Sequence, residues 1–105
     1  DVAVTGVQTC ALPIYFFLIA EAMIAAGVEL GLSHEVATEL TIQTLRGAGQ
    51  MLAESGLDAQ TLRANVTSPN GTTFAALSKL NEEGFSELIY QAMKAARDRS
   101  VELGK

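Results

Sequence analysis

The chain has 105 residues, of which 49% are apolar and 18% are charged. This length allows one domain, and this composition excludes a disordered segment. The net charge of −5, from 12 acidic and 7 basic residues, is the opposite of the basic surface that binds nucleic acid, so we expect no nucleic-acid partner. One cysteine and one histidine are too few for an intrachain disulfide framework or a zinc site, so we expect no bound metal.

Residues 1–14 differ in character from the remainder of the chain. They show no helical periodicity, and they contain the single cysteine and one of the two prolines. The string at 4–14 resembles a translated sequencing-adapter remnant. We therefore interpret residues 1–14 as a linker or a segment foreign to the native protein, and residues 15–105 as a folded domain that we expect to be part of a longer protein.

The first helix is expected from Tyr15 to about Leu30, and it is unusually apolar. Only Glu21 and Glu29 are charged there. They are eight positions apart in the sequence, which places them about 80° apart around a helix, so the helix has one narrow polar edge. A helix that is apolar nearly all round must be enclosed, and so short a chain has little else to enclose it with. We therefore expect a second copy of the chain to cover this helix.

The same apolar stretch is also a candidate membrane span. Residues 12–28 are at the short limit for a span, carry Glu21 near the middle and have no basic residue on either flank. A secretory signal would require a basic residue before the apolar run, and this chain has none there. We therefore expect no membrane partner and a cytoplasmic location.

The pattern of apolar residues predicts four further helices, at about 34–55, 59–65, 74–83 and from a cap at Ser86 to Leu103. Ser33 and Asp58 are suited to cap the starts of the first two, and Gly31 is placed to end the helix before them. No alternation typical of strands is present. The expected fold is all-α, a helical bundle of about five helices.

Residues 67–73, TSPNGTT, form the one dense turn signal in the chain. Such a turn opening directly into a helix predicts unpaired N–H groups at Gly71, Thr72 and Thr73, which together with the helix dipole favour an anion. The hydroxyls of Ser68, Thr72 and Thr73 add hydrogen-bonding groups for a carboxylate or a ring nitrogen. The alternative is that these hydroxyls only cap the helix, as Ser and Thr commonly do.

Residues 62–77, LRANVTSPNGTTFAAL, resemble the signature of pyrroline-5-carboxylate reductases, which runs L-[RK]-x-x-V-[ST]-S-P-G-G-[TA]-T-x-x-A-L. PIYFF at 13–17 is similar to the family's Pro-Ala-Tyr opening, GAGQML at 47–52 to its Gly-Ala-Ala-Lys-Met-Leu stretch, and RDRSVELG at 97–104 to its last helix. The family has glycine where this chain has Asn70, the residue that best tolerates a left-handed backbone after glycine.

The resemblance implies that the chain is the C-terminal helical dimerisation domain of an enzyme that reduces 1-pyrroline-5-carboxylate to L-proline. In that family an N-terminal Rossmann domain binds NADPH or NADH. The helical domain forms an intertwined homodimer, which can assemble further, and builds the pocket for the small-molecule substrate. This chain has no G-x-G-x-x-G motif, so we expect it to be inactive alone.

The resemblance also implies roles for individual residues. Ser68, Gly71, Thr72 and Thr73 would hold the carboxylate and ring of the substrate. Thr73 would lie nearest the imine nitrogen as the catalytic residue, and because a hydroxyl is a poor acid, its expected role is positioning and hydrogen bonding. Asn65 matches a position that would reach the nicotinamide end of the cofactor.

Two other interpretations stay open at this point. The chain can be a stand-alone helical dimerisation or interaction module without catalytic activity, which would dimerise without responding to a ligand at residues 68–73. It can also be a membrane-associated helical segment, which would need detergent to remain in solution.

Overall fold

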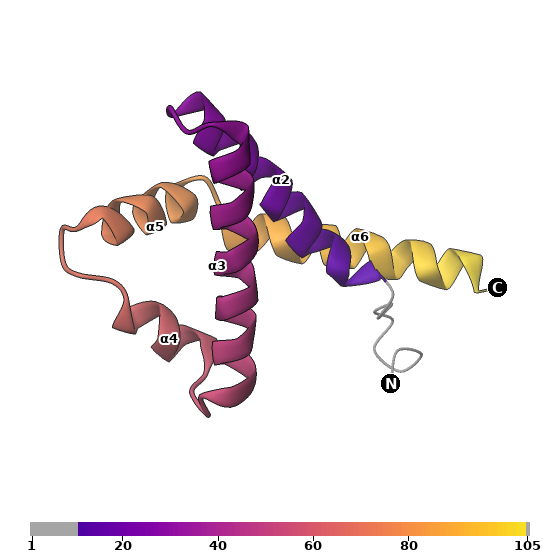
Figure 1. Cartoon of the computed structure of the whole chain (residues 1–105). Coiled ribbons are helices and arrows are strands. Elements are labelled where there is room, and N and C mark those ends of the chain that lie inside the picture. Colours follow the sequence, from indigo (N-terminus) through magenta and orange to yellow (C-terminus); the bar gives the residue numbers. More distant parts are fainter. Residues whose placement is uncertain (1–10, 105) are drawn as a thin grey trace. The chain divides into compact units, whose positions relative to one another are not determined.

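The computed structural model describes residues 11–104, and in that part of the chain it contains helices and no strand (Figure 1). The helices are α2 (Pro13–Glu29), α3 (His34–Glu54), α4 (Ala59–Asn65), α5 (Thr72–Glu82) and α6 (Phe85–Leu103). The prediction of an all-α chain is therefore confirmed. The helices divide between two compact units, one formed by residues 12–62 and one containing residues 63–104.

The first helix begins slightly earlier than expected. Pro13 and Ile14 already belong to α2. Proline is suited to the first helical turn because it has no N–H that would be left unpaired and because its φ angle is close to that of a helix. Residues 1–10 lie outside the described part of the chain, so the interpretation of residues 1–14 as a linker or foreign segment stays a prediction.

Helices α2 and α3 form an antiparallel hairpin (Figure 1). Gly31 has a φ of 117°, a left-handed conformation that glycine adopts without steric cost, and Ser33 Oγ accepts the N–H of Val36 at 3.2 Å. The helices approach closely at Gly27, where an added Cβ would lie 3.2 Å from the Cβ of Ala37. The predicted stop and cap are confirmed, and the small residue at the approach lets the hairpin close.

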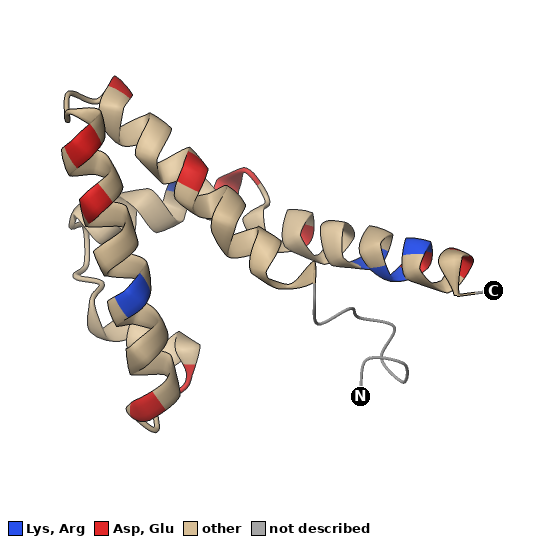
Figure 2. Ribbon diagram, turned by 45° about the vertical axis from the view of Figure 1, so that its right-hand side comes forward, with Lys and Arg blue, Asp and Glu red and all other residues tan. Residues whose placement is uncertain are grey.

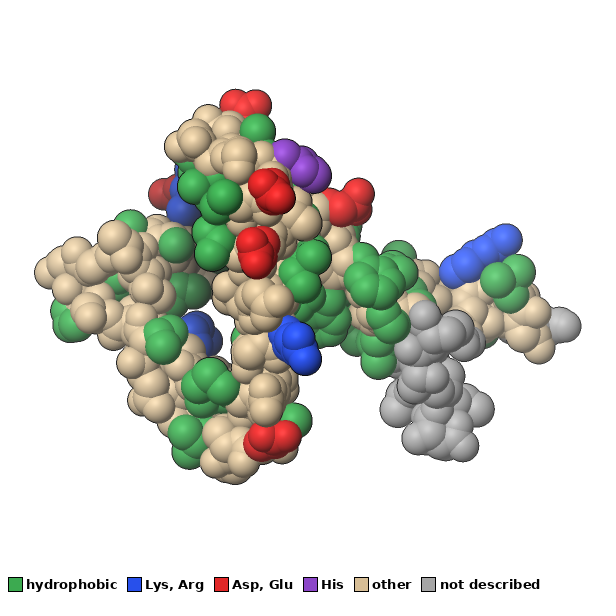
Figure 3. All heavy atoms as spheres, viewed as in Figure 1, with side chains coloured by type: hydrophobic (Ala, Val, Ile, Leu, Met, Phe, Trp, Pro, Cys, Tyr) green, Lys and Arg blue, Asp and Glu red, His purple; other side chains and the backbone are tan. Residues whose placement is uncertain are grey.

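The hairpin buries very little of its apolar surface. Ala37 and Thr41 are its buried residues, and α2 has none. Phe17 and Leu18 are 65% and 66% exposed, and apolar side chains are visible over the face of the molecule shown in Figure 3. One copy of the chain thus leaves its most apolar helix uncovered, as the sequence predicts. No helix among residues 11–104 has both the length and the apolar character needed to cross a membrane.

Helices α5 and α6 meet at a glycine. Gly84 has a φ of 79° and accepts the N–H of Leu88 at 2.9 Å, so it is the residue that begins α6. The predicted cap at Ser86 is wrong, because α6 begins at Phe85 and Ser86 lies within its first turn. A positive φ at Gly84 turns the chain between the two helices, which are separated by a two-residue turn, Glu83 and Gly84. Glycine meets that requirement without strain.

The later half of α6 carries interleaved charges (Figure 2). Asp98 pairs with Arg97 at 3.0 Å and with Lys94 at 3.6 Å, and Arg99 pairs with Glu102 at 2.8 Å. The hydrogen bond from Arg97 holds the pKa of the Asp98 carboxyl below its ordinary value. Exposed pairs of this kind contribute little to stability, so this part of α6 presents a charged surface to solvent.

A tight turn connects α4 to α5. The N–H of Gly71 donates to the carbonyl of Ser68 at 3.1 Å, and Asn70 has a φ of 61°. Proline at the second position and a positive φ at the third are the features of a type II β-turn. The expectation that Asn70 adopts the left-handed conformation is confirmed. Helix α5 begins directly after this turn, at Thr72, two residues earlier than predicted.

We predict that Asn70→Ala destabilises the chain and that Asn70→Gly does not. The left-handed conformation costs a residue with a Cβ about 1–2 kcal/mol, a cost that asparagine partly escapes and glycine avoids. Urea denaturation followed by circular dichroism should show a loss of about 1 kcal/mol for Asn70→Ala. Gln60→Ala, the loss of a side-chain amide in regular helix, is the control. Equal stability of the alanine and glycine variants would contradict the turn described here.

The cap of α4 predicts a pH dependence. Asp58 Oδ1 accepts the N–H of Thr61 at 2.8 Å, and hydrogen bonds from the hydroxyl and then the backbone N–H of Thr61 lower the pKa of the Asp58 carboxyl. Because the pKa is lowered in the folded chain, the cap stabilises α4 at pH values above the ordinary aspartate pKa of about 3.9. That contribution is lost as the pH falls through the lower, folded value.

The protection factor of the Thr61 amide is its exchange rate in an unstructured peptide at the same pH divided by its rate in the folded chain. Measured by NMR between about pH 5 and 2, it should therefore fall as the carboxylate is protonated. Asp58→Asn keeps an equally good cap but has no proton to bind, so its protection factor should lack this acid-dependent fall. The same fall in both proteins would show that the Asp58 carboxylate is not its origin.

Candidate functional site

The turn between α4 and α5 leaves backbone donors free at the start of α5. Within residues 11–104, no acceptor receives the N–H of Thr72 or Thr73, as expected for the first turn of a helix. The prediction of a free N–H at Gly71 is wrong, because that group closes the β-turn onto Ser68. Two of the three predicted donors, at the positive end of the helix dipole, thus remain open to an anion.

The side chains around these donors come together at Gly71. An added Cβ at this position would lie 3.3 Å from the Ser68 carbonyl oxygen and 3.4 Å from the Ser68 Cβ. A residue with a Cβ at this position would require Ser68 to shift by a few tenths of an ångström, whereas the φ of Gly71, −89°, is ordinary. Ser68 therefore lies beside the residue that precedes Thr72 and Thr73, and the four predicted substrate-binding residues form one continuous surface.

The hydroxyls of this surface do not cap the helix. Gly71 is the N-cap residue of α5, and no side chain in residues 11–104 makes a cap hydrogen bond there. The hydroxyls of Ser68, Thr72 and Thr73 have no hydrogen-bond partner in the described part of the chain; Ser68 and Thr72 are exposed and Thr73 is half-buried. The structure thus argues against the interpretation that these hydroxyls serve only as caps.

Asn65, predicted to reach the cofactor, is the last residue of α4. Its side chain is exposed, and it has no side-chain hydrogen bond within residues 11–104. It lies at the start of the segment that leads into the turn, three residues before Ser68. The site residues therefore all lie between the end of α4 and the second residue of α5.

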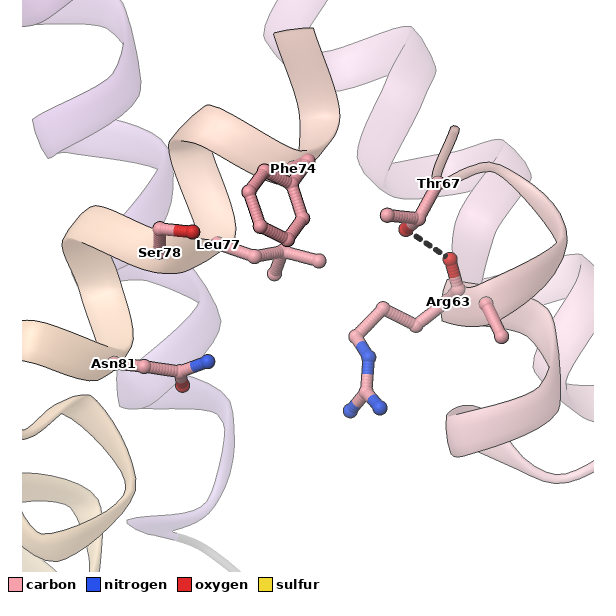
Figure 4. A pocket seen from close by; sticks show the side chains of 7 residues that line it. Arg63, Thr67, Phe74, Leu77, Ser78 and Asn81 are labelled. Carbon is pink, nitrogen blue, oxygen red and sulfur yellow. Dashed lines mark hydrogen bonds between the residues drawn. The ribbon is translucent and has the colours of Figure 1, made fainter. Parts of the chain in front are cut away.

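A pocket of about 410 Å³ lies next to the turn, between α4 and α5 (Figure 4). It is lined by Arg63, Ala64, Thr67, Phe74, Leu77, Ser78 and Asn81. The four residues from α5 are spaced i, i+3, i+4 and i+7, so they share one helical face. None of the predicted site residues lines this pocket. The pocket was not predicted from the sequence, although the spacing of these residues on α5 is a signal for a shared face.

Arg63 contributes the pocket's charge. Its carbonyl accepts the hydroxyl of Thr67 at 2.7 Å and the N–H of Val66 at 3.2 Å, which holds the last turn of α4 together. Its guanidinium makes no ion pair with any residue in the described range, and the side chain extends into the space facing α5 (Figure 4). The pocket therefore contains a cation without a counter-ion.

The described residues were also considered as a site for a metal or a dinucleotide. In residues 11–104, no group of three or more His, Cys, Asp and Glu side chains is placed to hold a metal ion. A dinucleotide site needs a strand that leads into a glycine-rich turn and a helix, and residues 11–104 contain no strand. These residues therefore do not fit a dinucleotide cofactor by themselves.

Comparison with known proteins gives a consistent result. The family model described as "Pyrroline-5-carboxylate reductase dimerisation" matches residues 2–103. The chain is 50% identical over 103 residues to a pyrroline-5-carboxylate reductase of Pseudomonas aeruginosa, covering 98% of this chain and 37% of that enzyme. It is 47% identical over 93 residues to the enzyme of Corynebacterium melassecola, covering 89% of this chain and 34% of that one.

Solved structures agree with the sequence comparisons. A pyrroline-5-carboxylate reductase from Coxiella burnetii superposes with a TM-score of 0.86 at 43% identity, over 90% of this chain and 35% of that one. The Plasmodium falciparum pyrroline carboxylate reductase, solved with NADP bound, gives a TM-score of 0.85 at 35% identity, over 89% of this chain and 36% of that one.

The chain thus spans little more than a third of the length of these relatives. On the match across residues 2–103 and the agreement in fold, the chain belongs to the pyrroline-5-carboxylate reductase dimerisation family.

Proposed function

We propose that this chain is the dimerisation and substrate-binding domain of an NAD(P)H-dependent reductase that converts 1-pyrroline-5-carboxylate to L-proline. The observation that carries the proposal is the turn before α5. It combines two free N–H groups, three free hydroxyls and a close-packed glycine, within the residues that resemble the family signature. The family to which the chain belongs supports the same function.

The turn is suited to the carboxylate of the substrate. The free N–H groups of Thr72 and Thr73 begin a helix of 11 residues, and a helix N-terminus stabilises a nearby anion by about 0.3–1 kcal/mol, or more where water is partly excluded. Hydrogen bonds to a charged group are stronger than those between neutral groups. We propose that these donors and the Ser68 hydroxyl hold the carboxylate and orient the ring.

Thr73 is the proposed catalytic residue, through positioning. It is half-buried and is the second residue of α5, whereas Thr72 is exposed, so Thr73 as a whole is more shielded from water than Thr72. A threonine hydroxyl is too weak an acid to be a good proton donor by itself, but it can donate a hydrogen bond that orients an imine nitrogen. The proposed role is therefore a hydrogen bond to the ring nitrogen while the carboxylate is held.

The nicotinamide cofactor is proposed to bind mainly outside this chain. The described residues do not fit a dinucleotide, and Asn65 is the one residue here that the family resemblance relates to its nicotinamide end. NADP is bound in the Plasmodium falciparum relative, which supports a nicotinamide cofactor for the whole protein. We also propose a cytoplasmic location.

The physical partner is proposed to be a second copy of the chain. Helix α2 has no buried residue although it is strongly apolar, and monomeric proteins rarely leave large apolar patches exposed. Membership of a dimerisation family supports a homo-oligomer. We propose an intertwined homodimer, in which the other copy covers the α2–α3 hairpin, and dimers of this kind can associate further.

Leu18→Glu tests this dimer. Leu18 is 66% exposed in the single chain, so a charge there should leave an isolated chain folded but should weaken a dimer that buries the position. Sedimentation velocity across a concentration series should show a dimer for the unmodified chain. For the variant, the dissociation constant of the dimer should be at least tenfold higher. Gln60→Glu adds the same charge at an exposed polar position and should not dissociate the dimer. A concentration-independent monomer for the unmodified chain would contradict the proposal.

Thr73→Ala tests the substrate site. L-proline added to the ¹⁵N-labelled chain should shift the amide signals of Thr72 and Thr73, and the variant should bind about fivefold more weakly, as expected for one lost hydrogen bond of about 1 kcal/mol. Thr73→Ser should restore most of the binding. Ser86→Ala is a matched control, because Ser86 is also the second residue of its helix.

A dimer that shows no response to proline at residues 68–73 would contradict the substrate site and favour an interaction module without catalytic activity. The activity itself is tested after fusion to an upstream dinucleotide-binding domain. There, turnover of 1-pyrroline-5-carboxylate should appear with NADPH or NADH and should be reduced by Thr73→Ala but not by Ser86→Ala.

A further inference from the structure

Most positive charges of this chain are neutralised by its own acids. Among residues 11–104, Lys79, Lys94, Arg97 and Arg99 all make ion pairs with neighbouring carboxylates. Arg46 and Arg63 are the two cations of that range without such a pair. Of these two, Arg63 lines the α4–α5 pocket, whose lining contains no acidic residue. The chain has a net charge of −5, and this pocket nevertheless carries an unpaired positive charge.

The wall opposite Arg63 combines polar and apolar groups. Ser78 and Asn81 lie on the same face of α5, and their side chains make no hydrogen bond within residues 11–104. Phe74 and Leu77 form the apolar part of the wall (Figure 4). The lining contains no acidic residue, so its side chains supply a planar cation, a hydroxyl, an amide and an apolar surface.

This combination defines a class of ligand. A guanidinium matches the geometry of a carboxylate or phosphate through two parallel hydrogen bonds. An amide and a hydroxyl can complete the contacts of such an anion, and a flat apolar group can pack against an aromatic ring. A volume of about 410 Å³ is in the range of pockets that hold small organic molecules.

We propose that the α4–α5 pocket is a binding site for a small organic anion, whose carboxylate or phosphate pairs with Arg63 and whose apolar body lies against Phe74 and Leu77. The site is distinct from the proposed substrate site, because none of Ser68, Gly71, Thr72 and Thr73 lines it. It is joined to that site by a single turn, since Thr67 and Phe74 flank residues 68–73. Its occupancy can therefore differ from that of the substrate site.

The experiment uses benzoate and inorganic phosphate as probes of the 105-residue chain. Benzoate carries a carboxylate on a flat apolar ring, whereas phosphate tests the charge alone. ¹H–¹⁵N spectra should show benzoate shifting the Arg63 Nε–H and Asn81 side-chain signals, with a Kd on the order of 10 mM as expected for a ligand of this size. Phosphate should bind more weakly, because it lacks the apolar group.

Variants separate a specific site from general attraction to positive charge. Arg63→Met should reduce benzoate binding at least tenfold, and Arg63→Lys should reduce it less, because lysine keeps the charge but not the planar fork. Arg46→Met removes the other unpaired cation and should leave the binding unchanged. Thr73→Ala, which is expected to weaken the response to proline, should also leave the benzoate response unchanged, so failure of this proposal is distinguishable from failure of the proposed function.

Three results would overturn the inference. The first is a benzoate response that survives in Arg63→Met. The second is an equal loss of binding in the Arg63→Met and Arg46→Met variants, which would indicate attraction to charge without a site. The third is an Arg63 Nε–H that responds to benzoate only on dilution to monomer, which would indicate that a second copy of the chain fills the pocket.

Discussion

The structure depends on a mismatch between the apolar surface that the chain carries and the material it has to cover that surface. Helix α2 is apolar on nearly every side, yet its main helical neighbour within its unit is α3, and the hairpin they form buries two residues, Ala37 and Thr41. Hydrophobic burial is the main favourable contribution to folding. A chain with this arrangement gains most of that contribution only when another surface covers the hairpin.

This constraint gives the membership of a dimerisation family a physical meaning. In an obligate dimer, association and folding are one process, because the apolar surface left open in one copy becomes the core of the pair. The close approach of Gly27 to Ala37 then has the role of closing the hairpin so that it offers a continuous apolar face. The family match and the exposed surface are thus two independent observations that support the same proposed assembly.

The proposed substrate site depends on a different interaction, the hydrogen bond from the Gly71 N–H to the Ser68 carbonyl. This bond removes one donor from the site, but it also closes the turn that brings Ser68 beside the start of α5. The close contact leaves little room for a side chain at Gly71, and the N–H groups of Thr72 and Thr73 remain free. The Gly71 N–H is therefore not available to a ligand, because it holds Ser68 and the start of α5 in position.

Local interactions were predictable from the sequence, because each is made by residues close together in the chain. The caps at Ser33 and Asp58 and the stop at Gly31 depend on bonds across three or four residues. The left-handed conformation of Asn70 follows from its place after a proline in a tight turn. The all-α class follows from the periodicity within each segment. The candidate site residues lie in one contiguous stretch that resembles the family signature, so they could be named from the sequence, and their roles stay a proposal.

The tertiary structure decided what depends on how separate elements meet. The glycine junction at Gly84, in place of a cap at Ser86, allows α5 and α6 to follow each other through a two-residue turn. The early start of α5 at Thr72 and the use of the Gly71 N–H were set by the geometry of the closed turn. The pocket at Arg63 forms only because α4 and α5 face each other across that turn. The sequence shows the periodicity of each helix, but only the folded turn determines which two faces come together and which charge is left without a partner.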